Sequence, residues 1–273
     1  MNRRTPLGFT LVEALIVLAV SGMILLTAVI FMSGRESSTR FSQSMRDIHS
    51  KMQDWINDVT TGYPGSAVGQ DNYCVLNGSR PLINSKAISG SSPTSSPDCI
   101  FLGKVVHFRS DDTKVYAYSV FGRRALPSGN LVTSLSEANP VVAVGTTSAA
   151  YNSGTADLTE AYQLKGGTRI KSIIEPTGTD RSRLGAFYLS FNPTSVKTNG
   201  SADLVAYQLP FSSNAAPGQS VYNCISMVSC ASPTTLSNWQ ICFESSDQSQ
   251  TAAITVSASG GSGVATSLGF KQC

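Results

Sequence analysis

The feature that most constrains this chain is an apolar run from Phe9 to Met32, FTLVEALIVLAVSGMILLTAVIFM. As an α-helix its 24 residues would extend about 36 Å, enough to cross the roughly 30 Å hydrocarbon core of a bilayer. Arg3 and Arg4 precede the run, and Arg35 follows it. The tendency of basic residues to stay in the cytoplasm predicts a single span with the N-terminus inside and the remainder outside.

Residues 1–8, MNRRTPLG, form a short basic leader that ends where the apolar run begins. In a secretory signal peptide the apolar region precedes the cleavage site, so here we expect the run to stay in the mature protein. Glu13 is the one charged residue in the run, and an ionised carboxylate in lipid is costly unless it finds a partner. Cleavage between Gly8 and Phe9 would create an α-amino group four residues from Glu13.

The string Gly8-Phe9-Thr10-Leu11-Val12-Glu13, followed by an apolar helix, resembles the prepilin peptidase motif of type IV pilins and type II secretion pseudopilins. The resemblance implies that a prepilin peptidase cleaves after Gly8 and methylates Phe9. It also implies that Glu13 pairs with the N-terminal amine of a neighbouring subunit as a filament grows. The implied partners are other pilin subunits, contacted through their N-terminal helices, an inner-membrane assembly platform, and membrane lipid before assembly.

One departure from the family pattern concerns proline. Major pilins commonly carry a helix-breaking proline about two-thirds along the apolar helix, where this chain has Ile30, and no proline occurs between Pro6 and Pro64. This favours a minor pilin, held in the cytoplasmic membrane with an exported head and then built into an extracellular filament. A type II secretion pseudopilin, or a tip adhesin or DNA-uptake subunit carried on such a filament, remains the alternative.

Residues 35–61 are predicted to continue the helix as an amphipathic stem. The apolar residues recur at intervals of three and four and define one helix face: Phe41, Met45, Ile48, Met52, Trp55 with Ile56, and Val59. As in pilins, we expect this stripe to dock on the sheet of the head. The alternative is an independent coiled coil, which a stripe of under three heptads disfavours. The residues around Gly62 and Pro64 should end the helix.

The remainder is predicted to be exported and mainly antiparallel, which gives an α+β fold class. We divide it into a connecting loop at 62–103 and a β-rich head at 104–273, whether of one lobe or two. Hairpin turns are expected at Ser110–Thr113 and at Gly166–Gly167. The predicted strands are Lys104–Phe108, Lys114–Val120, Val141–Val144, Gly185–Phe191, Leu204–Leu209, Trp239–Phe243 and Ala252–Ser257.

All six cysteines follow the stem, which suits disulfides formed in an oxidising compartment. Six cysteines allow fifteen pairings, so the sequence leaves the connectivity open. Our hypothesis is nearest-neighbour pairing, and free structural thiols are the alternative. The three pairs would be Cys74 with Cys99, Cys224 with Cys230, and Cys242 with Cys273.

Charge and motifs argue against catalysis and against nucleic-acid binding. Loss of Arg3 and Arg4 would leave 18 basic residues of the 20 against 17 acidic ones, so the mature chain lacks a basic footprint. The sequence contains no Gly-x-Ser-x-Gly elbow, P-loop or His-Glu-x-x-His pattern, and its histidines are His49 and His107. Asp111 and Asp112 alone are too few ligands for a calcium loop. We therefore expect no enzyme, cofactor or metal, and leave any ligand of the head open.

Overall fold

The computed structural model describes most of the stem and head. The described residues are 10–64, 73–77, 80–84, 99–109, 112–144, 158–174, 185–191, 204–209, 217–226, 234–235, 238–259, 263–271 and 273.

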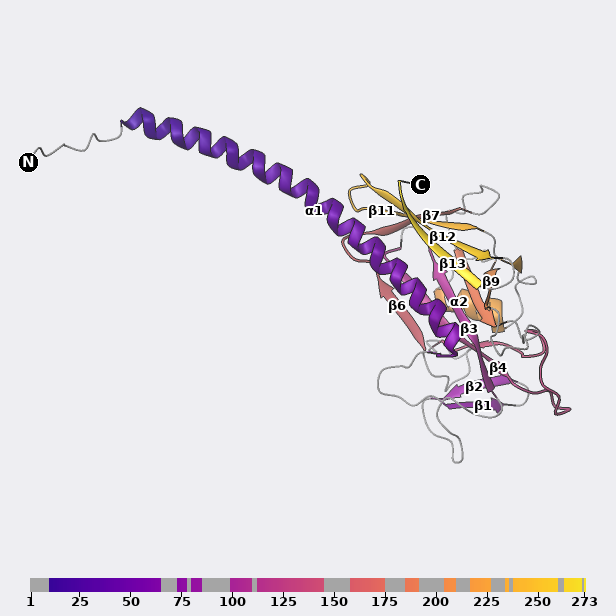
Figure 1. The fold of residues 1–273 in the computed structure, drawn as a ribbon. Helices are drawn as coiled ribbons and strands as arrows, with labels where there is room; N and C mark the ends of the chain where they lie inside the picture. The colour runs from indigo at the N-terminus through magenta and orange to yellow at the C-terminus, as the bar shows by residue number, and fades with distance from the viewer. Residues whose placement is uncertain are drawn as a thin grey trace, which may run out of the picture.

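Helix α1 (Leu11–Thr61) runs without a break through 51 residues, about 76 Å at the α-helical rise. Thr10 caps its start in an extended conformation, and its side chain accepts a hydrogen bond from the Glu13 N–H. Gly62 ends it in the left-handed conformation at φ 72°, with its N–H donating to the carbonyls of Asp58 and Val59. The N-terminal half projects away from the head, and the C-terminal half lies across it (Figure 1).

A seven-stranded antiparallel sheet forms the larger layer of the head. Its strands run in the order β10-β9-β8-β3-β4-β5, and β6 also pairs with β4. Strands β3 and β4 pair with neighbours on both sides, so they lie inside this sheet, and each is ten residues long. The bounds are β3 (Cys99–Phe108), β4 (Lys114–Arg123), β5 (Val141–Val142), β6 (Thr159–Gln163), β8 (Gly185–Phe191), β9 (Leu204–Leu209) and β10 (Thr234–Thr235).

A second antiparallel sheet has four strands in the order β13-β12-β11-β7. Its bounds are β7 (Arg169–Ile174), β11 (Trp239–Glu244), β12 (Thr251–Ser259) and β13 (Gly263–Phe270). A separate hairpin of β1 (Tyr73–Asn77) and β2 (Arg80–Asn84) lies at the other end of the head (Figure 1).

The main core lies between α1 and both sheets, and a second core lies behind the larger sheet. Strand β3 serves both because its side chains alternate: Val106 and Phe108 join the stripe of α1, and Val105 joins the cluster around helix α2 (Pro217–Ser226). The head is therefore layered, with α2, the larger sheet, and then α1 with the smaller sheet.

The predicted α+β class is confirmed, as is the docking of the stem on the sheet. Strands β8 and β9 have the predicted bounds, and β3 begins five residues earlier than predicted, at Cys99. The segment predicted as a connecting loop contains β1 and β2. The expected hairpin at Gly166–Gly167 is wrong, because β6 before it pairs with β4 whereas β7 after it pairs with β11. Strands β6, β7, β10 and β13 and helix α2 were not predicted.

Candidate assembly site along helix α1

The start of α1 combines a cap with an acidic residue. The Thr10 hydroxyl accepts from the Glu13 N–H at 3.3 Å, which satisfies one of the free donors of the first turn. The Glu13 carboxylate sits in that turn, where the helix dipole favours negative charge. Gly8 and Phe9 lie outside the described residues. The geometry therefore fixes Glu13 at the helix end that follows the predicted cleavage point.

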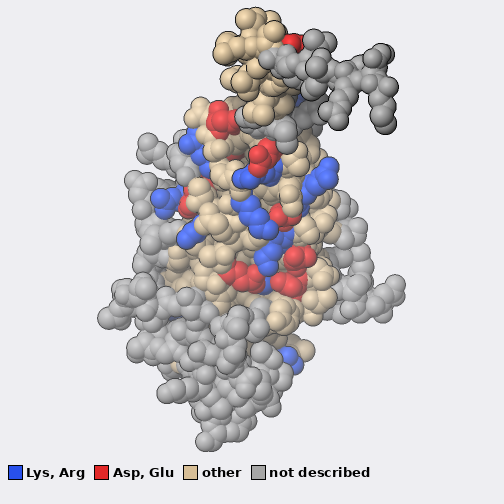
Figure 2. Space-filling view, turned by 90° about the vertical axis from the view of Figure 1, so that its left-hand side faces the viewer, with Lys and Arg blue, Asp and Glu red and all other residues tan. Residues whose placement is uncertain are grey.

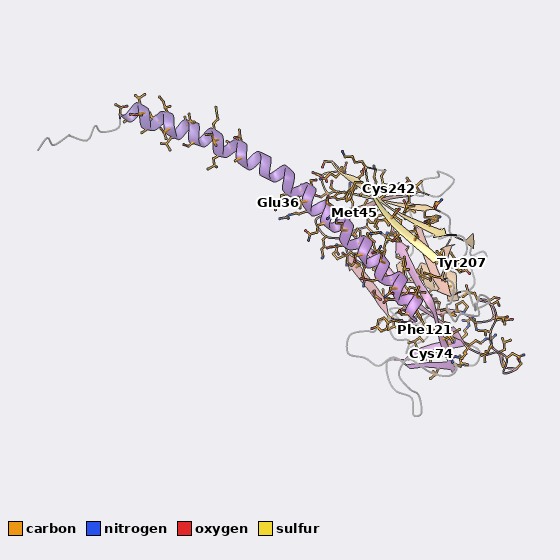
Figure 3. All side chains as sticks on the ribbon, in the orientation of Figure 1. Glu36, Met45, Cys74, Phe121, Tyr207 and Cys242 are labelled. Atoms are coloured by element: carbon orange, nitrogen blue, oxygen red, sulfur yellow. A yellow bond between two sulfur atoms is a disulfide. The ribbon has the colours of Figure 1, made fainter. Side chains whose placement is uncertain are left out.

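The N-terminal half of α1 is apolar all round and uncovered by the rest of the chain. Within the described residues, Leu11–Ala28 is long and apolar enough to cross a membrane, with mean hydropathy 2.4 and no part of it buried. Leu11 and Met23 expose 77% and 75% of their surface. Side chains radiate from this half in all directions, whereas Met45 lies inside the head (Figure 3). Such a helix needs lipid or other chains around it.

The Thr27 side chain in this half of α1 illustrates the same demand. The Thr27 hydroxyl donates to the Ile24 carbonyl at 2.8 Å and lies 3.2 Å from the Met23 carbonyl. A hydroxyl in hydrocarbon finds no water, so bonding to the preceding turn removes the penalty of burial. Glu13 differs, because hydrogen bonds to the local backbone cannot neutralise a full charge in lipid.

The C-terminal half of α1 buries one stripe against the head. Met45, Ile48, Trp55 and Val59 each retain none of their surface, and Phe41 and Met52 retain 1%. The opposite side of the stem stays polar, and the face of the head from which α1 emerges carries intermingled acidic and basic side chains (Figure 2). The stem forms two exposed ion pairs: Arg40 with Glu36 within α1, and Asp47 with Lys165 of the head.

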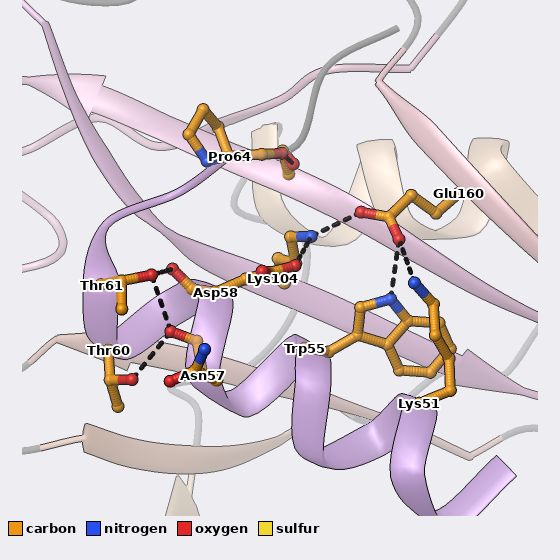
Figure 4. Close-up of polar contacts among 10 residues, drawn as sticks. Lys51, Trp55, Asn57, Asp58, Thr60, Thr61, Pro64, Lys104 and Glu160 are labelled. Carbon is orange, nitrogen blue, oxygen red and sulfur yellow. Dashed lines mark hydrogen bonds and ion pairs between the residues drawn. The ribbon is translucent and has the colours of Figure 1, made fainter. Parts of the chain in front are cut away.

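A cluster centred on Lys104 joins the stem to the larger sheet (Figure 4). Lys104 is 1% exposed, and its Nζ lies 2.7 Å from Asp58 Oδ2 and 2.5 Å from Glu160 Oε1. Trp55 Nε1 donates to the other oxygen of Glu160 at 2.9 Å, and Lys51 lies 3.2 Å from that same oxygen. The buried ammonium is thus matched by two carboxylates from two different elements.

The pKa of Glu160 reports the balance in this cluster. Burial by itself raises it, but the hydrogen bonds from Lys104 and Trp55, with the charges of Lys104 and Lys51, outweigh burial and hold the pKa of Glu160 below its ordinary value. The carboxylate therefore stays ionised, and its charge faces the ammonium of Lys104.

Comparison with known families bears on the N-terminal half. Residues 3–29 match the family described as the prokaryotic N-terminal methylation motif. The N-terminus therefore matches a prepilin-type methylation motif. The match includes Gly8, Phe9 and Glu13, and it supports the resemblance to type IV pilins and pseudopilins. No curated protein and no solved structure matches the chain.

The motif and the exposed apolar helix together support a pilin-like or pseudopilin structural subunit. The motif implies processing by prepilin peptidase and assembly with other pilins. The apolar helix supports anchoring in a membrane through the N-terminus.

The structure joins Cys74 to Cys99 and Cys242 to Cys273. The first bond ties the β1–β2 hairpin to the start of β3, and the second ties the last residue of the chain to β11. Cys224 on α2 is also disulfide-bonded, and Cys230 lies outside the described residues. The described disulfides therefore lie in the head, apart from α1.

His49, His107 and Asp112 lie apart from the apolar half of α1. His49 Nε2 lies 3.1 Å from the Thr266 hydroxyl, at the contact between α1 and β13. His107 is buried in β3, where burial and the charge of Arg109 lower its pKa to about 4. Asp111 lies outside the described residues, and among those described no three His, Cys, Asp or Glu side chains gather as metal ligands.

Sequence reasoning missed the Lys104 cluster. Asp58 is not part of the predicted docking stripe, and Glu160 lies in a segment with no predicted strand. One signal was available: Lys104 is the single charge in the string GKVVHF of a predicted strand, and a lysine flanked by buried positions calls for a carboxylate partner.

Proposed function

We propose that this chain is a minor-pilin-like structural subunit of a type IV pilus or related filament. It is inserted in the cytoplasmic membrane by α1 with its N-terminus inside, cleaved between Gly8 and Phe9, methylated at Phe9, and assembled through its N-terminal helix. The observation that carries the proposal is the uncovered apolar stretch Leu11–Ala28, which lies within the residues that match the methylation motif and holds one charge, Glu13. The unbroken course of α1 supports a minor subunit.

Glu13 is the residue assigned to assembly. Its carboxylate is a single charge among apolar side chains. A partner must compensate for the free-energy cost of removing that charge from water. After cleavage, the amine of Phe9 in a neighbouring subunit is also a charge in lipid. Pairing the two removes both penalties, and attraction in low dielectric acts only when the two groups meet. Glu13 therefore selects the register at which a subunit enters the filament.

The decisive experiment substitutes Glu13→Val in cells that also make the wild-type chain. We expect leader cleavage and membrane abundance to stay near wild type, while incorporation into filaments falls at least tenfold. The matched control is Glu36→Val, which removes an exposed carboxylate of the same helix outside the span. Incorporation of the Glu13→Val chain at the wild-type level would show that Glu13 has no role in assembly.

Processing is tested separately at Gly8. A bulky or charged residue there should block peptidase cleavage, because the proposed cut directly follows Gly8. Mass spectrometry of the N-terminus of filament-derived protein should find methylated Phe9. Recovery of chains that still begin at Met1 would contradict the proposed maturation.

A further inference from the structure

An open cavity lies where α1 leaves the head, beside the side chain of Glu36 (Figure 3). Its volume is about 320 Å³, at the lower end of the roughly 300–1,000 Å³ of sites that take small ligands. Three parts of the chain meet there: α1, the turn between β6 and β7, and the turn between β11 and β12. The lining residues are Glu36, Ser37, Arg40, Gly166, Ser245 and Ser246. The cavity is therefore walled by hydroxyls and by charges of both signs.

The charged groups favour a ligand that carries both an anion and a cation. Arg40 Nη2 lies 2.5 Å from Glu36 Oε1, and because both side chains are exposed, little stability is lost when the pair opens to admit a ligand. Asp247 lies close by, since its Oδ2 accepts from the Ser37 hydroxyl at 3.5 Å. Hydrogen bonds, led by that from Ser245, lower the pKa of Asp247 to about 2, so it stays ionised. Two carboxylates beside one guanidinium disfavour a bare phosphate and favour a phosphate with its own ammonium group.

Two buried hydroxyls lie next to the lining residues in the chain. Ser44 follows Arg40 by one helical turn, and Thr168 follows Gly166 by two residues; both are buried. Among the described residues, neither of these hydroxyls has a hydrogen-bond partner. Buried polar atoms nearly always have one, so this end of the contact between α1 and the head is polar and incompletely satisfied by the protein alone.

The cavity lies at the depth of the lipid head groups when α1 is inserted as proposed. The apolar run ends at Met32, and Glu36 follows by four residues, about 6 Å along the helix. The head-group layer adds roughly 5–7 Å on each side of the hydrocarbon core. Arg40 is one turn farther, but its guanidinium reaches back to Glu36, because helical side chains point toward the N-terminus. Both charges therefore lie among the head groups of the outer leaflet.

We propose that the cavity binds the head group of an ethanolamine phospholipid while the subunit awaits assembly. The phosphate accepts from the Arg40 guanidinium and the Ser37 hydroxyl, and the ammonium donates to the Glu36 carboxylate. A choline head group has no N–H to donate, so it lacks the contact with Glu36. The bound lipid holds this end of the head against the membrane and is released when the subunit enters the filament. The inference rests on the proposed function for the membrane orientation of α1.

The test places the full chain in vesicles of mixed ethanolamine and choline phospholipids and adds a water-soluble carbodiimide, which couples a carboxylate to a primary amine in contact with it. Peptide mass spectrometry should find the lipid amine coupled to Glu36. This adduct should fall at least fivefold in Arg40→Gln and stay unchanged in Arg46→Gln, on the exposed face of α1. Loss of Arg40 also frees the Glu36 carboxylate, which by itself would increase coupling, so a fall reports the lost phosphate contact.

A second pair of variants tests the cavity and leaves its charges in place. Ser37→Leu fills the cavity and should lower the adduct at least fivefold, whereas Ser38→Leu, exposed and outside the lining, should not. Unchanged coupling in Arg40→Gln and Ser37→Leu would overturn the site and show that Glu36 meets head groups by proximity alone. Equal coupling of soluble phosphoethanolamine, at the same amine concentration in choline vesicles, would overturn the assignment to a lipid.

Flotation of the chain with the vesicles separates this inference from the proposed function. A chain that does not float contradicts both, because the lipid site requires insertion of α1. A floating chain with unchanged coupling in the variants contradicts the lipid site alone. Glu13→Val should float and couple like the parent chain, so a failure of the assembly role assigned to Glu13 would leave the lipid site standing.

Discussion

The two halves of α1 share one backbone geometry and have opposite surroundings. From Leu11 to Ala28 every side chain is exposed, whereas Met45, Ile48 and Trp55 are completely buried by the head. The N-terminal half is apolar on all sides, and the C-terminal half confines its apolar residues to one stripe. The head thus completes the C-terminal half, while the N-terminal half can be completed only by lipid or by other chains.

Large-to-small substitutions are expected to give the largest difference in unfolding free energy between the two halves of α1. Trp55→Ala should lower the free energy of unfolding of the head by about 3–5 kcal/mol, because it leaves a cavity and removes the indole donor to Glu160. Met23→Ala, in the exposed half, should leave that free energy unchanged. Urea unfolding in mild detergent, followed by the fluorescence of the buried Trp239, measures both. Equal losses in the two variants would contradict the division of α1.

Acid should act on the head, against which the C-terminal half of α1 docks, and spare the apolar half of α1. The pKa of His107 is lowered to about 4 in the folded head by burial and by the Arg109 charge, against about 6.5 when unfolded. Between these values the unfolded chain binds a proton that the folded chain excludes, so stability is complete above pH 6.5 and falls as the pH drops to 4. The loss should approach about 3 kcal/mol.

The variant His107→Gln isolates this contribution. The difference in unfolding free energy between pH 7 and pH 4 should shrink by that amount in the variant, measured by the same urea titrations. The helix content of the N-terminal half in detergent should not follow the pH in either protein. An identical pH dependence of the two proteins would assign the acid sensitivity to other groups.

The smallest expected effect compares two glycines with open space around them, Gly22 in the apolar half of α1 and Gly62 at its C-terminal cap. A Cβ at Gly62 or at Gly22 would meet no atom within 4 Å, so packing does not distinguish them. Gly62 adopts φ 72° at the helix end, where alanine is strained, and Gly62→Ala should destabilise the head by about 1 kcal/mol. Gly22→Ala should instead strengthen the exposed half by about 1 kcal/mol. Circular dichroism with urea unfolding distinguishes the two responses.

Local patterns predicted much of the helix and part of the sheet. The intervals between Phe41, Met45 and Ile48 were enough to identify the docking stripe, because a helical face is defined by neighbours three and four residues apart. Strands β8 and β9 were found because each is a short apolar string between turn residues. Strand β13 was missed because Gly263–Phe270 is rich in small residues and half exposed, so it has little apolar alternation.

The sequence by itself determined the membrane-length helix, the methylation motif with Glu13, and the stripe by which the stem docks. All of these are properties of residues close together in the chain, where helix geometry and hydropathy act directly. Only the tertiary structure decided that the stripe lies against two sheets, that β6 and β7 diverge after Gly167, and that Lys104 meets Asp58 and Glu160. These contacts join residues 46 and 56 positions apart or more, and strand order and burial arise from the packing of the whole head.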